Sequence, residues 1–174
     1  MTKLEKEYYL ELIVNNPTEF ALKKESNLDL TELDFSDLTL EGINLSDCEL
    51  TDSLFIESNL TDINFSNSDL TAAKFTRANV VECDFSNAIL NGTDFSYAVL
   101  NFNNFQNADM SGCIFIGSDL SNCDLSTCDN LDAARYDEST QWPSDDNLPE
   151  NFDCSIIQDL SSLQDDDYID SRFN

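Results

Sequence analysis

The chain contains no histidine, so it lacks the side chain that most often serves as a general base or a metal ligand. Catalytic arrangements that pair serine or cysteine with histidine are therefore excluded. Only 4 glycines and 3 prolines occur among the 174 residues, which leaves few of the residues that usually form tight turns. The sequence also has no apolar run of about 18 residues, the length that suggests a membrane-spanning helix.

Positive charge is scarce too, with 8 Lys and Arg against 35 Asp and Glu, for a formal net charge of −27. Residues 1–27 carry a net charge of −1, residues 28–130 carry −16 and residues 131–174 carry −10. Phosphate neutralisation requires clustered cations, and an anionic membrane would repel this chain. We therefore expect neither direct nucleic-acid binding nor membrane binding, and favour a cationic protein surface, divalent ions or simple solubility.

A large apolar residue recurs at every fifth position from Leu30 to Leu125, and all twenty of these positions hold Leu, Phe, Val or Met. We call them the centres. The residue two places before a centre is Ala, Cys, Ser or Thr in 14 of the 20 cases, which indicates a second inward position, the filler, for small side chains. A period of five fits neither an α-helix nor a β-strand over this length, so the chain must turn every five residues.

Polar side chains explain how the chain turns with so few glycines. The residue before a centre is Asp or Asn in 13 of 20 cases, and the residue after it is Ser or Thr in 13 of 20. Asp and Asn tolerate turn geometry and accept hydrogen bonds from nearby backbone amides. We expect these side chains to form the corners.

A longer period of twenty residues gives the number of sides. Every twentieth residue from Phe35 to Phe115 is phenylalanine. Four pentapeptides therefore make one coil, and phenylalanines of successive coils are expected to stack while the backbones pair between coils. Five coils at roughly 4.8 Å each would give a prism about 24 Å long.

The repeat Ala73-Lys74-Phe75-Thr76-Arg77, seen again as Ala108-Asp109-Met110-Ser111-Gly112, resembles that of the pentapeptide-repeat family over about 100 residues. This resemblance implies an all-β solenoid, a right-handed quadrilateral β-helix of about five coils, and most members have no assigned activity. Residues 134–143 also resemble the segment that follows the repeats in many cyanobacterial members.

The two ends of the solenoid need caps, because the terminal coils would otherwise expose apolar side chains. Capping-box spacing at Thr2 and Glu5 predicts a helix to about Val14, and Asn16-Pro17 predicts the start of a second. The large fillers of the first coil suit such a lid: Leu28, Leu33, Leu38 and Ile43. We assign residues 1–27 to a helical cap, 28–130 to the β-helix and 131–174 to a C-terminal tail.

Within the tail, a capping box and apolar spacing predict a short helix at about 156–163. Two roles remain open for it, as a cap on the last coil or as a contact between two copies. The protein is thus expected to be a monomer or a homodimer joined by this helix. Because the first residues do not form the apolar run of a secretory signal, we expect a cytoplasmic protein.

The cysteines give no strong sign of chemistry. Five of the six fall at the filler phase and are interpreted as buried small side chains: Cys48, Cys83, Cys113, Cys123 and Cys128. Whether Cys123, Cys128 or Cys154 forms a disulfide stays open. Carboxylates are abundant, but a convex prism offers no obvious cleft in which their pKa values would shift. We predict no enzymatic activity, no cofactor and no metal site.

Two candidate interaction surfaces remain. The first is a row of carboxylates on the side that contains Leu30, suited to a basic partner: Asp29, Glu32, Glu49, Asp52, Asp69 and Asp109. The second consists of apolar residues at outward positions, of which four flank Phe55 and Phe115 and three lie near another side: Leu54, Ile56, Ile114 and Ile116, then Val81, Val99 and Phe102. Exposed apolar patches often mark contacts, although a cap or the tail would cover them equally well.

Two functions follow from these observations. The first is a non-enzymatic scaffold that binds an unidentified protein. The alternative is an acidic DNA mimic that inhibits a type II topoisomerase, as acidic members of the family suggest. Charge favours the second hypothesis, whereas the short solenoid does not, since a duplex carries one charge per ~1.7 Å of its axis.

Overall fold

The computed structural model describes residues 1–150 and 152–155. It begins with two helices, α1 (Lys3–Asn15) and α2 (Pro17–Lys23). At the start of α1 the Thr2 side chain accepts a hydrogen bond from the Glu5 amide, and the Glu5 carboxylate accepts one from the Thr2 amide. Asn16 caps α2, and Pro17 occupies its first turn. Both helices match the sequence prediction, and no helix in the described residues is long and apolar enough to span a bilayer.

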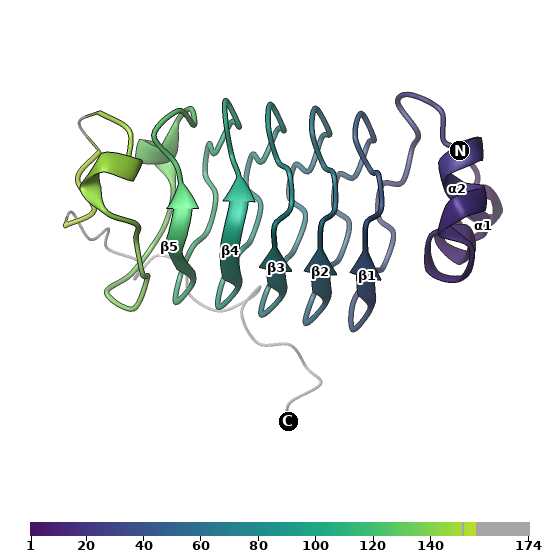
Figure 1. Cartoon of the computed structure of the whole chain (residues 1–174), viewed down its shortest axis with the longest axis horizontal. Coiled ribbons are helices and arrows are strands. Elements are labelled where there is room, and N and C mark those ends of the chain that lie inside the picture. Colours follow the sequence, from purple (N-terminus) through teal and green to yellow (C-terminus); the bar gives the residue numbers. More distant parts are fainter. Residues whose placement is uncertain (151, 156–174) are drawn as a thin grey trace.

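The rest of the chain winds into a parallel β-solenoid (Figure 1). One side is a sheet of five parallel strands in sequence order: β1 (Thr39–Glu41), β2 (Asn59–Thr61), β3 (Asn79–Val81), β4 (Val99–Asn104) and β5 (Asp119–Asp124). Leu40 pairs with Leu60, and Leu60 with Val80, so the register advances by twenty residues per strand. This spacing confirms that four pentapeptides make one coil.

Three further sides are held by single bridges that also link residues twenty apart, such as Asp29 to Glu49, Asp34 to Leu54 and Asn44 to Asn64. The coil is therefore four-sided, which confirms the predicted quadrilateral β-helix. We name each side after its first centre, as the Leu30, Phe35, Leu40 and Leu45 walls. Since the walls follow one another in this order around each coil, the Leu30 and Leu40 walls lie on opposite sides.

All twenty centres are buried, and nineteen of them have no exposed surface. Phenylalanines stack along the axis in two columns, as in the pair Phe55 and Phe75, whose ring centroids lie 4.6 Å apart with an interplanar angle of 7°. Rings of the two columns meet edge to face, as Phe55 and Phe65 do at 86°. These are the two favoured geometries of aromatic pairs, and the core consists largely of them.

The corners combine two devices. Asp or Asn before a centre accepts a hydrogen bond from the amide two residues later, as Asp34 does from Ser36 at 2.9 Å. The left-handed residue, however, stands two places after the centre, a position that the sequence pattern did not single out. All four glycines occupy this position, and it is otherwise filled by residues such as Glu32, Ala72 and Tyr97. Left-handed backbone is unfavourable for residues other than glycine, so most corners carry some strain.

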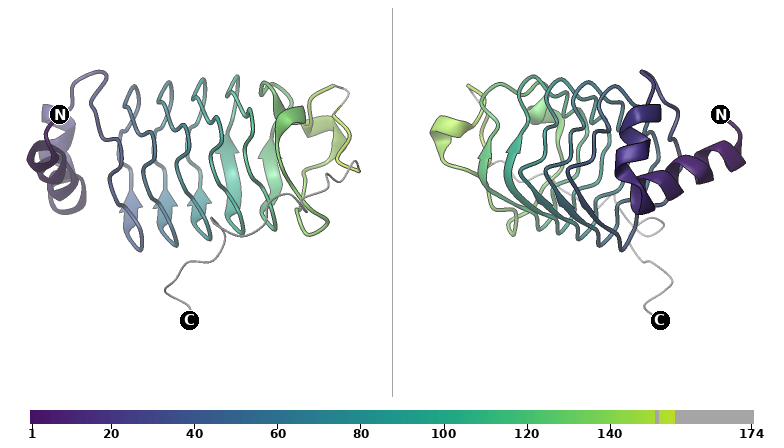
Figure 2. Two further views of the ribbon diagram at one scale, coloured as in Figure 1. Left: turned by 180° about the vertical axis from the view of Figure 1, so that it is seen from behind. Right: turned by 45° about the vertical axis from the view of Figure 1, so that its right-hand side comes forward.

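Figure 2 shows α1 and α2 lying across the first coil. Leu12, Ile13 and Phe20 from the helices are buried there. The predicted large fillers of that coil also contribute, because Leu28 and two others are buried and Leu38 packs against the same core. The helices therefore cover apolar surface that the first coil would otherwise expose to water.

At the other end, backbone pairing continues beyond residue 130. Arg135 pairs with Ile114, and Gln141 pairs with Asp119 of β5. The segment includes two short 3-10 helices, η1 (Leu131–Ala133) and η2 (Asp145–Asn147). Part of the assigned tail thus forms an irregular further turn of the solenoid. The helix predicted at 156–163 lies outside the described residues.

Candidate interaction surfaces

The Leu30 wall places the predicted carboxylates in rows along the solenoid axis. Asp29, Glu49 and Asp69 follow one another in a ladder of bridges, which continues through Ile89 to Asp109. Glu32 and Asp52 stand at the adjacent corner with left-handed backbones. The structure therefore brings the six residues to one side of the molecule, although Ile89 interrupts the row.

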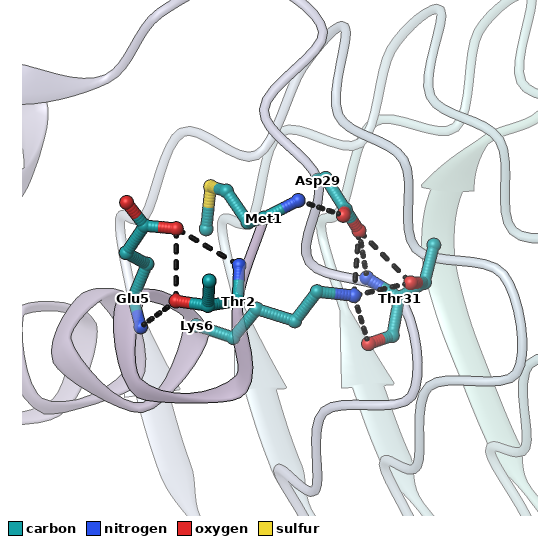
Figure 3. Close-up of polar contacts among 6 residues, drawn as sticks. All are labelled: Met1, Thr2, Glu5, Lys6, Asp29 and Thr31. Atoms are coloured by element: carbon teal, nitrogen blue, oxygen red, sulfur yellow. Dashed lines mark hydrogen bonds and ion pairs between the residues drawn. The ribbon is translucent and has the colours of Figure 1, made fainter.

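Asp29 is engaged by the N-terminal segment (Figure 3). Its carboxylate lies 2.7 Å from the Lys6 ammonium group and 2.8 Å from the amine of Met1, and it accepts two hydrogen bonds from Thr31. Desolvation acts to raise the pKa of Asp29, but these hydrogen bonds outweigh it and hold the pKa well below its usual range. Asp29 therefore joins the cap to the first coil and is not a free contact site.

Asp109 is also occupied. Its carboxylate accepts a hydrogen bond from Asn130 Nδ2 at 2.8 Å and another from the Ser111 amide at 3.1 Å. The Asn130 hydrogen bond is the main reason that the pKa of Asp109 is lowered. Asp69 is half-buried and accepts a hydrogen bond from the Thr71 amide. The exposed members of the row are thus Glu32, Glu49 and Asp52, which gather over the first two coils.

The predicted apolar patch on the Phe35 wall is not continuous. Leu54, Ile56 and Ile114 are half-buried, and Ile116 is buried with 8% of its surface exposed. The bridge ladder from Leu54 to Ile114 passes through Lys74 and Asp94, which places charged residues between the two apolar pairs. The four residues therefore form two separate apolar pairs, each half-buried or buried.

Apolar side chains are exposed elsewhere on the solenoid. On the Leu40 wall and its corners, Tyr97 is 48% exposed, Val99 is 38% exposed and Phe102 is 65% exposed. Ile89, on the Leu30 wall, is 45% exposed. The sequence pattern singled out Val99 and Phe102 but missed Tyr97 and Ile89. Both missed residues occupy positions of the repeat that are mostly polar in the other pentapeptides. An apolar residue at a mostly polar position is the signal that would have identified them.

Tyr97 has a visible packing role at its corner. The Arg77 guanidinium lies 6.0 Å from the centre of the Tyr97 ring, and Arg77 also pairs with Glu57 at 3.6 Å. On the other side, a Cβ atom added to Gly117 would lie only 2.6 Å from the Tyr97 ring. The residues Glu57, Arg77, Tyr97 and Gly117 therefore form a packed column along one edge.

The five cysteines predicted to be fillers are buried, Cys154 is half-buried, and all six are free thiols. Desolvation raises the pKa of Cys48 and Cys123 to about 11 and that of Cys83 and Cys128 to about 12. These thiols stay protonated at neutral pH and are poor nucleophiles. In the described part of the chain, no group of three or more Cys, Asp or Glu side chains is arranged to hold a metal ion.

The fold defines a class of proteins, namely four-sided parallel β-solenoids. The model of the family "Pentapeptide repeats" matches eight copies, over residues 48–87, 81–115 and 93–129. These matches span residues 48–129, and this part of the chain is a run of pentapeptide repeats of that family. A search of curated proteins finds no match.

Among the solved structures that resemble this chain, one has a TM-score above 0.5 and shows the same fold. The pentapeptide repeat protein Rfr23 from the cyanobacterium Cyanothece 51142 is 18% identical, with a TM-score of 0.57, and the match covers 81% of this chain and 99% of that one. The protein alr5209 from Nostoc Pcc 7120 is also 18% identical, with a TM-score of 0.46 and coverages of 87% and 88%. QnrB1, a plasmid-mediated fluoroquinolone resistance protein, is 21% identical, with a TM-score of 0.42 and coverages of 64% and 56%.

Proposed function

We propose that the protein is a non-catalytic interaction module that binds a basic region of a partner protein through the Leu30 wall. The observation that carries this proposal is the contact between Lys6 and Asp29. Asp29, the first carboxylate of the acidic row, already binds the Lys6 ammonium group of α1. Glu49, which pairs with Asp29 from the next coil, is exposed, and so are Glu32 and Asp52 at the corner beside these two coils.

Electrostatics favour a cationic partner. The segment 28–130 carries a net charge of −16, with Lys74 and Arg77 as its two cations. Both belong to the Phe35 wall and its corner, so they leave the Leu30 wall without a positive side chain between residues 28 and 130. A field of one sign speeds association with an oppositely charged surface and weakens as salt is added.

The test is to capture partner proteins on the immobilised purified protein and on a variant that combines three substitutions, Glu32→Gln, Glu49→Gln and Asp52→Asn. These three residues are exposed, so the variant should keep its fold. We expect the parent to retain a defined basic protein that is released by about 0.5 M salt, because the Debye length then falls well below 10 Å. The variant should retain much less of it. Equal retention by the two proteins would contradict the assignment of the Leu30 wall.

A second candidate function is a DNA-mimicking inhibitor of a type II topoisomerase, which the formal net charge of −27 favours. The rung spacing disfavours it, because successive rungs lie about 4.8 Å apart whereas a duplex carries a charge every ~1.7 Å. A gyrase supercoiling assay decides between them. Inhibition at micromolar protein that is lost in the triple variant would support the mimic, and unchanged supercoiling would remove it.

A further inference from the structure

Phe102 is the most exposed aromatic residue in the described part of the solenoid. Phe102 is 65% exposed, while the other phenylalanines in the described residues are buried or half-buried. It stands at the corner between the Leu40 and Leu45 walls, where the three preceding coils place Gly42, Asp62 and Glu82. An aromatic ring at this position gains little from burial, so the fold itself does not account for it.

The backbone of Phe102 is also unfavourable. Its φ angle is 57°, in the left-handed region, which is rare for a bulky residue. Tyr97 shares this conformation but packs against Arg77 and over Gly117, as described above. Left-handed backbone recurs at most corners of the solenoid, so this conformation alone does not set Phe102 apart; what sets it apart is a bulky, exposed aromatic ring at such a corner.

The sheet is irregular at the same place. Val99 pairs with Asp119, twenty residues on, but Asn101 pairs with Asn122, which is twenty-one residues on, so a bulge separates β4 from β5 here. Below the corner, the buried Asn103 donates a hydrogen bond from Nδ2 to the Val80 carbonyl and accepts one from the Cys83 amide. Bulges redirect side chains and are common beside functional sites. The Asn103 hydrogen bonds join β4 to the preceding coil at this position.

The surroundings of Phe102 are apolar at the centre and acidic at the rim. Val99 is exposed on β4, and Val81 of β3 pairs with Asn101, which brings Glu82 beside Phe102. Further carboxylates flank the same strands. Asp119 pairs with Val99 on the Leu40 wall, and Asp84 and Asp124 pair with Asn104 on the Leu45 wall. The segments 79–87, 99–107 and 119–127 contain no Lys or Arg.

The negative charge around Phe102 indicates what kind of segment can bind there. A second copy of the chain would bring an equal net charge of −27 against the acidic rim. The C-terminal segment 156–174 contains five Asp and one Arg, so it is repelled as well. A cationic segment with an apolar residue at its middle satisfies both the rim and the centre.

We infer that Phe102, with Val99 and Val81, forms an anchor site for an apolar side chain of a basic partner segment, and that Glu82 and Asp119 contact its cations. The site lies on the opposite side of the coil from the Leu30 wall. A test of this site is therefore independent of the function proposed for the Leu30 wall. An aromatic side chain at the centre of a polar rim is the usual composition of a binding hot spot.

The probe is a short fluorescent peptide in which lysines flank a Leu-Trp-Leu anchor, with a lysine–serine peptide of equal length and charge for comparison. The variant is Phe102→Asn, because asparagine tolerates left-handed backbone and should preserve the fold. Ile89→Asn is the matched control. Ile89 is also exposed and also lies between two carboxylates, Asp69 and Asp109, but it has neither the bulge nor the strained backbone.

The parent should bind the anchored peptide about tenfold more tightly than the lysine–serine peptide, and Phe102→Asn should abolish this difference. Ile89→Asn should leave it unchanged. The melting temperature of Phe102→Asn should be between that of the parent and about 2 °C above it, because the left-handed backbone strain is relieved. The inference is overturned if the two peptides bind alike to the parent, if Phe102→Asn changes the ratio less than twofold, or if Ile89→Asn lowers it equally.

Discussion

The two ends of the solenoid are closed by different physical means. At the first coil, α1 and α2 bury Leu12, Ile13 and Phe20, and a polar contact between Lys6 and Asp29 fixes their position. At the last coil the closure is aromatic. Trp142 meets Phe115 edge to face at 5.9 Å and also contacts Tyr136 and Phe152, which extends the aromatic packing of the core.

This difference shows which interactions the repeat itself can provide. The aromatic closure continues the edge-to-face geometry already present between the two phenylalanine columns. The helical closure adds a new element and needs a charged contact to orient it. We therefore expect both ends to depend on pH, the first through the ion pair of Asp29 and the second through Asp137, where desolvation acts to raise the pKa but hydrogen bonds from Ser139 and Gly117 outweigh it and lower the pKa. Both ends should matter less than the middle, since a middle coil contacts two neighbours and an end coil contacts one.

The largest effect is expected in the middle. Phe75→Ala removes a fully buried ring that stacks between Phe55 and Phe95 and meets Phe65 and Phe85 edge to face. We expect a loss of about 4 kcal/mol in the free energy of unfolding, measured by denaturant titration, because a cavity opens in the core. The exposed control Glu82→Gln should change it by less than about 0.5 kcal/mol. A loss smaller than that of the end variants would refute the ranking.

At the last coil, Trp142→Ala should cost about 2 to 3 kcal/mol, less than the value for Phe75 because Trp142 is only half-buried. Hydrogen exchange locates the damage. Amide protection should fall in the last coil, around Phe115 and Leu120, and should be retained around Leu40. Uniform loss of protection along the chain would show that the end is not a separate unit.

At the first coil, Asp29→Asn should cost about 2 kcal/mol at pH 7, since it leaves the half-buried Lys6 without its charged partner. The folded-state pKa of Asp29 is lowered, so its contribution is present above the unfolded-state pKa of about 3.9 and is lost as the pH falls through the folded value. The difference between the variant and the parent should therefore shrink below about pH 4. Glu49→Gln, on the next rung, serves as the control at each pH.

The smallest effects are expected at the corners, where left-handed residues of successive coils should make similar contributions to the free energy of unfolding. Ala72 and Gly92 occupy equivalent left-handed positions one coil apart. Ala72→Gly should stabilise the protein by about 0.5 kcal/mol, since relief of the left-handed strain exceeds the entropy lost by glycine. Gly92→Ala should destabilise it by about 1 kcal/mol from strain alone, because an added Cβ has no atom within 4 Å. The same sign for both changes would contradict this view of the corners.

The interior could be predicted from the sequence almost residue by residue. The centres from Leu30 to Leu125 all point inward, because a strict period leaves only one phase that is apolar throughout. The two N-terminal helices followed from local capping signals at Thr2 and Asn16. Such features depend on neighbours in the sequence or on an exact repeat, and both can be read without coordinates.

The surface could be predicted only in part. The row through Asp29 and Glu49 followed from the period, but the contact of Asp29 with Lys6 joins residues 23 apart through the placement of a helix. The bulge beside Phe102 breaks the twenty-residue register and so could not follow from it. The continuation of the solenoid to Gln141 was also missed, because residues 131–147 lack the five-residue pattern.

The most direct test of the account is to locate where a basic, anchored peptide contacts the solenoid. Amide chemical shifts of the full chain, followed by NMR during titration with the lysine and Leu-Trp-Leu peptide, give this map. We predict that the largest changes fall on β4 and its neighbours, at residues 81–82, 97–104 and 119–122. Changes centred on the Leu30 wall, or spread evenly over all four walls, would contradict an anchor site at Phe102.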